Sequence, residues 1–595
     1  MKRQKVEKRQ KHSQLEHGNE GKRLLFFFIL SLNFLSLAPV AAASITSDFR
    51  NYAAPVKNSL LAQDTPQQEE NLFEYWIGLC DSLNGEQKYA EALAACDRAL
   101  DTNPKDAVTW IKRSDVMLKL TKYAEALASA ERAIKIQPEY SLALAYGCSA
   151  LYELGRYEQA IAACDRAIAG DGNWGTISPA FALYNRGLAL SKLGKPQEAI
   201  ASYDSALAIN PKYSLVLAAR CATLSQLARY EEVIAACDLA LAGDGNWGNS
   251  SPAIAWYNRG LALSRLGRLE EAVASYNNAV AIDPKDAATW TYQGMALGQL
   301  GKHAEALTAH EFALKINEKY ALALVNRCAT LNKLGKFPEA LAACESAIQG
   351  DGKWGEFGPA FAWDQRGNSL TGQGKLEEAL ASVNRAIAIK PDYAEAWNNR
   401  SVTLWRMGRY EEALASSDRA ITINREYSQG WFNQGRILRT LGRYEAALAA
   451  YDLALKNEDK VGDSRTIADV WANRSVVLWH LRRYKEALAS TDRAIGINPD
   501  SGQGWYNRGI VLLALERYEE AIASYDRAIG INAKDANFWT GRGIALKNLQ
   551  RYEQALAAFE EALKIAPTQA QAQENIKIVQ RKLQERTPAS NPKPK

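Results

Sequence analysis

Apolar and polar positions follow a pattern along this chain that recurs every 34 residues, from about residue 73 to residue 569. Residues 253–286 carry the plain form of this repeat. When its places are numbered 1 to 34, apolar or small residues fall at places 4, 8 and 11, and again at places 20, 24 and 27. Spacings of three and four residues predict two helices in each repeat, each with one apolar stripe. Neither short helix can bury its stripe alone, so successive repeats must stack.

The sizes of the residues at these places indicate how the two helices pack. Small residues such as Gly260, at place 8, let the two backbones come close, while large residues such as Tyr276, at place 24, fill the gaps between successive helix pairs. Gly267, at place 15, marks the break between the helices. Pro284, at place 32, ends the second helix because proline cannot continue one. The sequence therefore predicts an all-α array of helix-turn-helix repeats.

Eight places of the repeat also carry a resemblance to a known family. They hold Trp256, Gly260, Leu263, Gly267, Ala272, Tyr276, Ala279 and Pro284. Their pattern resembles the tetratricopeptide repeat (TPR), a helix-turn-helix of the same period. The resemblance, to exported bacterial proteins with such repeats, implies a right-handed superhelical solenoid with an extended concave face. Laid along the chain, the pattern gives about fourteen repeats, which begin near residues 73, 107, 141, 180, 214, 253, 287, 321, 360, 394, 428, 468, 502 and 536.

Four repeats are longer than 34 residues. Those that begin at residues 141, 214 and 321 end in GDGNWGTISP, GDGNWGNSSP and GDGKWGEFGP, and the one at residue 428 ends in EDKVGDSRTI. Glycines that allow positive φ, and a proline that restarts a helix, predict ordered turns. Asp171 and Asn173 are similar to the start of a calcium loop, but its final Glu is absent, and we predict no metal site. We expect Trp174, Trp247 and Trp354 to pack these turns onto the neighbouring helix.

Charge and hydropathy set the amino terminus apart from the repeats. The formal net charge of +5 is carried by residues 1–23, so the rest of the chain is formally neutral. An apolar run, residues 24–39, and an A-x-A pattern at Ala41 and Ala43 follow. This order predicts a secretory signal in residues 1–43, cleaved after Ala43, which would place the repeats in the periplasm or another lumen, or secrete them. The alternative is an uncleaved membrane anchor, because residues 24–43 are just long enough to span a bilayer.

Three further segments flank the repeats. Residues 44–72 are polar and lack a sustained period, which predicts a flexible linker before the TPR array of residues 73–569. Residues 570–586 are more polar than a repeat and are expected to form the capping helix that the open end of an array needs. Residues 587–595 are expected to form a disordered tail.

The eight cysteines occupy places 8 and 24 of four repeats, sixteen residues apart in each. Where place 8 holds glycine or serine, place 24 holds no thiol. The two places lie on facing sides of the two helices, within reach of a disulfide, and an exported protein meets the oxidising conditions for one. The alternative is that cysteine serves as a small core residue, while metal binding lacks further ligands nearby. The predicted disulfides are Cys80–Cys96, Cys148–Cys164, Cys221–Cys237 and Cys328–Cys344.

The sequence offers no arrangement of residues for catalysis. Only five histidines occur, two of them in residues 1–43, and none accompanies the partners of a hydrolytic or zinc centre. Phosphate-binding and dinucleotide-binding glycine motifs are also missing. We predict no enzyme activity and no cofactor. Nucleic acid is a poor partner for a charge-balanced array, and Arg at place 7 with Asp at place 25 predicts internal ion pairs.

The resemblance also indicates where a partner would bind, because places 2, 5, 9, 12 and 13 line the concave groove in the family. The family's clamp for C-terminal carboxylates needs Lys or Arg at place 5, which these repeats lack. Aromatic and arginine side chains carry much of the binding energy at protein interfaces, so a protein or peptide is the expected ligand. For Trp405 and Trp479 the alternative is that they only cover adjacent helices. The predicted partner-binding residues are Phe181, Tyr184, Tyr257, Trp405, Arg406, Arg439, Trp479 and His480.

These observations predict a non-catalytic scaffold for protein–protein interactions, or a complex-assembly factor, outside the cytoplasm. The alternative is a carbohydrate-binding or enzyme-associated envelope module in which the tryptophans stack on sugars. The membrane would be a partner only through an uncleaved amino-terminal anchor.

Overall fold

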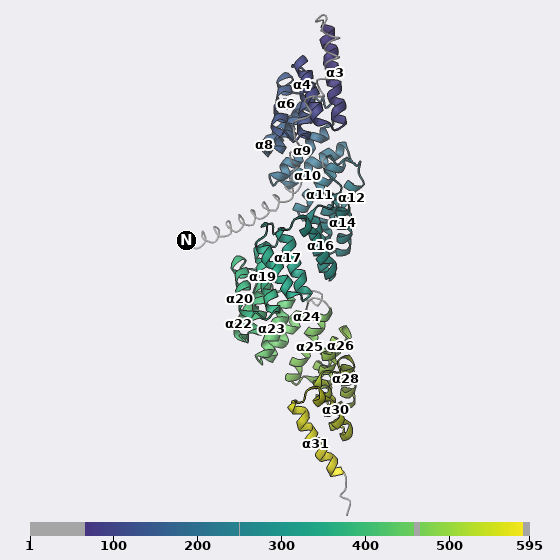
Figure 1. The fold of residues 1–595 in the computed structure, drawn as a ribbon, viewed down its shortest axis with the longest axis vertical. Helices are drawn as coiled ribbons and strands as arrows, with labels where there is room; N and C mark the ends of the chain where they lie inside the picture. Colours follow the sequence, from purple (N-terminus) through teal and green to yellow (C-terminus); the bar gives the residue numbers. More distant parts are fainter. Residues whose placement is uncertain (1–65, 176, 249, 457–463, 587–595) are drawn as a thin grey trace, which may run out of the picture. The chain divides into compact units, whose positions relative to one another are not determined.

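The computed structural model describes residues 66–586, apart from residues 176, 249 and 457–463. These residues form 29 helices and no strand (Figure 1). The chain divides into two compact bodies, Met1–Glu318 and Lys319–Lys595, which we refer to as the N-terminal and C-terminal bodies. Each is described by itself.

In the N-terminal body, the described helices form consecutive pairs, one pair for each predicted repeat. The pairs are α3 (Pro66–Gly85) with α4 (Tyr89–Thr102), α5 (Ala107–Lys119) with α6 (Tyr123–Ile136), α7 (Ser141–Glu153) with α8 (Tyr157–Ala169), α9 (Pro179–Lys192) with α10 (Pro196–Ile209), α11 (Ser214–Gln226) with α12 (Tyr230–Leu241), α13 (Ala253–Arg265) with α14 (Leu269–Ile282), and α15 (Ala287–Gln299) with α16 (His303–Ile316).

The C-terminal body continues the series and ends in a single helix. Its pairs are α17 (Ala321–Lys333) with α18 (Phe337–Ile348), α19 (Gly358–Gly372) with α20 (Leu376–Ile389), α21 (Ala394–Arg406) with α22 (Tyr410–Ile423), α23 (Ser428–Thr440) with α24 (Tyr444–Leu455), α25 (Ser464–His480) with α26 (Tyr484–Ile497), α27 (Gly502–Ala514) with α28 (Tyr518–Ile531), and α29 (Ala536–Asn548) with α30 (Tyr552–Ile565), followed by α31 (Ala570–Arg586). The predicted all-α fold of tandem helix pairs with a capping helix is confirmed.

The two helices of a repeat pack through the small residues that the pattern singled out. In the pair α13–α14, Gly260, Ala272 and Ala279 are buried, and the ring of Tyr276 is buried completely. A Cβ atom at Gly260 would lie only 2.6 Å from Cε1 of Tyr276, which is closer than carbon atoms approach without displacement. The absence of a side chain at place 8 therefore sets how near the two helices lie.

The turn between the two helices has one shape throughout the array. The residue at place 15 has positive φ in all fourteen repeats, whether it is glycine, as in Gly155 (φ 74°) and Gly267 (φ 76°), or not, as in Thr121 (φ 59°). Left-handed backbone costs a residue with a side chain about 1–2 kcal/mol relative to glycine. Stacking of the repeats thus imposes this conformation even where the sequence does not favour it.

Each body curves toward the first helices of its repeats. Within a body, every first helix contacts the first helix of the next repeat, whereas the second helices make no contact of similar extent with one another. The side on which neighbouring helices approach is the shorter side of a stack, so it becomes concave. We define the first-helix face of each body as the surface formed by places 2, 5, 6, 9, 12 and 13 of these helices.

Three of the longer turns fold back over the first helix of their own repeat. Asp171 Oδ1 accepts hydrogen bonds from the backbone N–H groups of Ser141, at 3.0 Å, and Asn173, at 2.9 Å. Although partial burial opposes ionisation, these bonds lower the pKa of Asp171 below its ordinary value. Because Tyr140 at the N-cap offers no side-chain cap, Asp171 caps α7 from thirty residues away. Asp244 and Asp351 do the same at α11 and α17.

The tryptophans of these turns are half-buried. Trp174 and Trp247 pack against the hydrophobic clusters of the N-terminal body, as expected. Trp354, in the C-terminal body, is half-buried as well.

Several predicted segments lie wholly or partly outside the described residues: the secretory signal of residues 1–43, most of the linker of residues 44–72, and the tail of residues 587–595. The linker's last residues, from Pro66 onward, belong to α3 instead, with proline at a position where its fixed φ suits the start of a helix. Over the part of the chain that the structure describes, no helix combines the length and the apolar character needed to cross a membrane.

Candidate functional site

The arginines at place 7 join each repeat to the preceding one. Arg259 Nε donates to Asp238 Oδ1 of the repeat before it at 2.7 Å, and its Nη1 donates to Ser275 of its own repeat at 2.8 Å. Its guanidinium also lies 5.8 Å from the ring of Trp256. Equivalent bridges are Arg113–Asp97, Arg186–Asp165, Arg220–Asp204, Arg366–Glu345, Arg474–Asp452, Arg508–Asp492 and Arg542–Asp526.

These bridges are internal ion pairs, as predicted. Their carboxylates are about half exposed, so each pair contributes on the order of 0.5 kcal/mol. Their effect is cumulative, because the same bridge recurs and fixes the register between one repeat and the next within each body.

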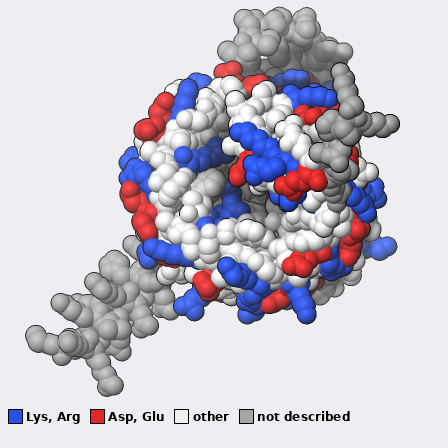
Figure 2. All heavy atoms as spheres, turned by 90° about the horizontal axis from the view of Figure 1, so that it is seen from below, with Lys and Arg blue, Asp and Glu red and all other residues white. Residues whose placement is uncertain are grey.

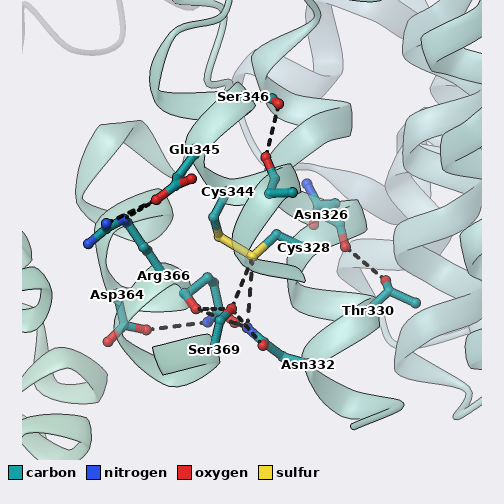
Figure 3. The surroundings of a disulfide bond; sticks show 12 residues. Asn326, Cys328, Thr330, Asn332, Cys344, Glu345, Ser346, Asp364, Arg366 and Ser369 are labelled. Atoms are coloured by element: carbon teal, nitrogen blue, oxygen red, sulfur yellow. Dashed lines mark hydrogen bonds and ion pairs between the residues drawn. A yellow bond between two sulfur atoms is a disulfide. The ribbon is translucent and has the colours of Figure 1, made fainter. Parts of the chain in front are cut away.

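The structure brings the two cysteines of every predicted pair together. Their Cα atoms lie 5.3 or 5.4 Å apart, within the range of disulfides, and the sulfur atoms are at bonding distance. In the C-terminal body, Cys328 lies 3.8 Å from the hydroxyl of Ser369 and from the amide of Asn332 (Figure 3). All eight cysteine side chains are fully buried.

Places 8 and 24 of a repeat face each other, and the side chains there differ in size from repeat to repeat. Glycine at place 8 faces a large ring in Gly435 with Tyr451, whereas Gly367 faces the smaller Val383. In four repeats both places hold cysteine, and there the two sulfur atoms meet.

In the N-terminal body, each predicted partner-binding residue packs on a neighbouring aromatic ring. Phe181 is half-buried, with its ring centroid 5.7 Å from that of Tyr146. Tyr184 lies 6.4 Å from the ring of Tyr203, and burial raises its pKa well above the ordinary value. Tyr257 is only 9% exposed. Its assignment to an open binding surface therefore needs correction, because neighbouring rings cover it.

In the C-terminal body, Trp405 and Arg406 end helix α21 on the first-helix face. Trp405 Nε1 donates to Thr440 Oγ1 of α23 at 3.0 Å, which fixes the indole across the gap between the two helices. Arg406 is exposed and its Nη1 donates to the carbonyl oxygen of Thr371 at 2.7 Å. Trp405 thus covers an adjacent helix and remains half-exposed on the face.

Helix α23 adds two arginines to this region. Arg439 was predicted, but Arg436 was not. The guanidinium of Arg436 lies 4.6 Å from the ring centroid of Trp405 and 5.8 Å from that of Phe432. Its signal in the sequence is that place 9 holds valine or isoleucine in the neighbouring repeats, for example Val402. We refer to Arg406, Arg436 and Arg439 as the arginine cluster.

Trp479 and His480 end helix α25 and continue the same face. Trp479 is 36% exposed, and its ring meets that of His480 edge to face at 5.1 Å. His480 stacks on Tyr444 of α24, with centroids 4.3 Å apart and planes 6° from parallel. Burial and the positive charge of Arg439 lower the pKa of His480, so the imidazole stays neutral over a wider pH range.

A polar ladder joins places 5 and 6 of successive first helices in this body. Asn399 Nδ2 donates to Asp364 Oδ1 at 2.8 Å, and Asn433 Nδ2 donates to Asn398 Oδ1 at 2.8 Å, so each bond joins successive first helices. Asp364 is 1% exposed, and burial raises its pKa to about 7 despite the bond from Asn399. Sequence reasoning missed Asp364, although an acid at place 5 stands out among the repeats.

Charge is balanced over most of the molecule. On the face seen in Figure 2, basic and acidic side chains are interspersed and form no large patch of one sign. Among the described residues, no group of three or more His, Cys, Asp or Glu side chains is arranged to hold a metal ion.

Solved structures of helical-repeat proteins are similar to this chain. The APC/C hetero-tetramer Cut9-Hcn1 matches with 16% identity over 89% of this chain and 98% of that chain, at a TM-score of 0.44. YrrB, described as a TPR protein with an unusual peptide-binding site, matches with 20% identity over 33% and 97%, at 0.29. A TPR protein from Parabacteroides merdae matches with 18% identity over 44% and 99%, at 0.33. No curated protein matches in sequence.

Family models match the chain directly. Together they cover more than half of its residues, and the matches at 180–213 and 253–286 each span one helix pair, α9–α10 and α13–α14. The tetratricopeptide repeat models match residues 180–213, 253–286, 111–174, 403–462, 432–502, 472–537 and 506–570, and a TPR repeat model matches residues 367–408. The chain therefore belongs to the tetratricopeptide repeat family.

Proposed function

We propose that this protein is a non-catalytic scaffold that holds protein or peptide partners against its first-helix face, outside the cytoplasm. Protein binding is the common property of TPR arrays, and the repeats account for most of the described chain. The location and the face are the specific parts of the proposal.

The observation that carries the choice of face is the group of aromatic and arginine side chains at the ends of α21, α23 and α25. Trp405, Arg406, Arg439 and Trp479 lie at places 12 and 13 of successive first helices, half-buried to exposed. Such side chains provide large contact area and charge-assisted hydrogen bonds with little loss of entropy. In the N-terminal body the predicted rings Phe181, Tyr184 and Tyr257 pack against neighbouring rings instead, so we assign partner binding mainly to the C-terminal body.

Partner binding is tested with the Trp405→Ala, Trp479→Ala double variant in a pulldown from extracytoplasmic protein. We expect loss of specific partners, because both indoles leave the face while the repeat cores stay intact. Trp397→Ala is the matched control: this indole lies at place 4 of α21, donates to the carbonyl oxygen of Pro391 at 3.0 Å and is off the face. Full partner binding by the double variant would refute the site. Binding on a glycan array instead of to protein would support a carbohydrate-binding module.

The extracytoplasmic location is supported by the four cysteine pairs, which are spaced for disulfides that reducing compartments do not maintain. A disulfide that closes a loop of sixteen residues stabilises a fold by about 3 kcal/mol. We expect mass spectrometry of the protein from its native host, alkylated without reductant, to find no reactive thiols. Eight alkylated cysteines would contradict both the bonds and the proposed location.

A further inference from the structure

The arginine cluster differs from the two arginine patterns that recur with ion pairs in the array. Arginines at place 7 bridge successive repeats, and several at place 16 pair with a glutamate one turn later, as Arg409 does with Glu412 at 2.7 Å. Arg406, Arg436 and Arg439 form no ion pair with any carboxylate within the described ranges. Three positive charges are thus brought onto one first-helix face, from places 13, 9 and 12 of two successive repeats, with no carboxylate of the described residues bonded to them.

The charges of the cluster repel one another. Burial lowers the pKa of Arg436, and Arg439 and Arg406 lower it further, while Tyr451 and Asp469 act in the opposite direction. The exposed carboxylate of Asp469, at place 2 of α25, supplies one negative charge against three guanidinium groups. Anionic oxygens placed among the three guanidinium groups would relieve this repulsion.

The cluster is also held in place before any ligand arrives. The indole of Trp405 is fixed by its hydrogen bond to Thr440, and the guanidinium of Arg436 stacks on that indole. The N–H groups of this guanidinium have no hydrogen-bond partner among the described side chains. Beside it, the hydroxyl of Tyr451 is buried and unpartnered in the same part of the structure. A guanidinium presents five N–H donors in a fixed fork that matches a carboxylate. Preorganised donors bind with less entropic cost than flexible ones.

From this geometry we propose that the arginine cluster binds carboxylate side chains of an acidic, extended peptide segment in a partner protein, whose apolar side chains contact Trp405 and Trp479. The inference rests on the proposed function and names the chemistry of its partner. Acidic peptide is favoured over nucleic acid because the same first-helix face also carries two exposed carboxylates, Asp469 and Glu395, both at place 2. A phosphodiester chain would run along these carboxylates, whereas a short peptide can place its acids between them.

The test uses the full chain and a phage-displayed library of random dodecapeptides. We expect the wild type to enrich peptides rich in Asp and Glu, and the Arg406→Gln, Arg439→Gln variant to lose this enrichment. Synthetic copies of the enriched peptides should bind the double variant about 100-fold more weakly, or about tenfold for each arginine removed. Their affinity should fall as salt is raised.

Two further variants separate the site from general charge and from folding. The Arg409→Gln, Arg443→Gln variant removes the same charge from exposed arginines at the N-caps of second helices, which pair with Glu412 and Glu411, and should bind like the wild type. Arg436→Lys keeps the charge but loses the fork, so it should bind acidic peptides with intermediate affinity. Hydrogen exchange in α21 and α23 checks that each variant is folded.

Every other outcome counts against the inference. Acidic peptides that bind the cluster variant as well as the wild type would place their site elsewhere. Enrichment of peptides without acidic residues would overturn the arginine site and leave the scaffold function standing, while enrichment of no peptide would count against both. A single-stranded oligonucleotide could also displace the acidic peptides from the wild type, but not from the cluster variant, at a lower concentration than free peptide does. That result would assign the cluster to nucleic acid.

Discussion

The contact between Gly260 and Tyr276 gives a quantitative test of why the repeat needs glycine at place 8. In the Gly260→Ala variant, the new Cβ would lie 2.6, 2.8 and 2.9 Å from three ring atoms of Tyr276. The ring is completely buried and cannot swing away freely. Overpacking of this kind costs about 1–3 kcal/mol, whereas alanine gains about 1 kcal/mol over glycine in a helix interior. Because three ring atoms are involved, the steric cost should lie near the upper end of its range, at about 3 kcal/mol. After the gain in helix propensity, we expect the variant to be destabilised by about 2 kcal/mol.

A second background isolates the steric part. In the Tyr276→Ala variant the ring is gone, so Gly260→Ala should stabilise the repeat by about 1 kcal/mol through helix propensity alone. The two backgrounds should then differ by about 3 kcal/mol in the effect of the same substitution, which is the coupling energy of the pair. Gly267→Ala is the control, because its φ of 76° imposes strain but no atom lies within 4 Å of the added Cβ. Its effect should be equal in both backgrounds.

The assay is hydrogen exchange of the full chain, read by mass spectrometry on peptides from α13 and α14. Local opening free energies are preferable to a global melting curve, because repeat arrays do not unfold in one step. Equal destabilisation by Gly260→Ala in both backgrounds would refute the reasoning and would assign the role of this glycine to the backbone.

Two further predictions concern the turns and the buried acid. Thr121→Gly should stabilise α5 and α6 by about 1 kcal/mol, because threonine at φ 59° is strained and glycine is not. Gly155→Thr, at φ 74°, should destabilise its repeat by a similar amount. If hydrogen exchange finds no change for either variant, the backbone at place 15 is not strained. Asp364 keeps its proton up to a pKa of about 7 in the folded state but releases it near 3.8 when unfolded, so stability should fall as pH rises from about 4 to above 7. Asp364→Asn should remove this fall, as read by hydrogen exchange of peptides from α19 and α21 in the full chain, and an unchanged pH profile would show that the acid is not buried in solution.

The sequence by itself determined the repeat and its internal geometry. A spacing of 34 residues, with small residues at fixed places, is enough to predict two helices, a turn at place 15 and close packing at place 8. The cysteines could be paired for the same reason, because places 8 and 24 of one repeat face each other whatever the neighbouring repeats contain. Within a repeat, the distance along the chain is short, and helix geometry fixes which side chains meet.

Contacts between repeats were decided only by the tertiary structure. Tyr257 and Trp405 occupy predicted face positions, yet one is buried by its neighbours and the other remains half-exposed. The cap that Asp171 supplies to α7 depends on a turn that folds back over thirty residues. Arg436 became part of a candidate site because the ring of Trp405, one repeat earlier, lies under it and no carboxylate pairs with it among the described residues. A periodic pattern gives the direction of each side chain, whereas exposure, charge compensation and partners depend on which particular residues the next repeat brings beside it.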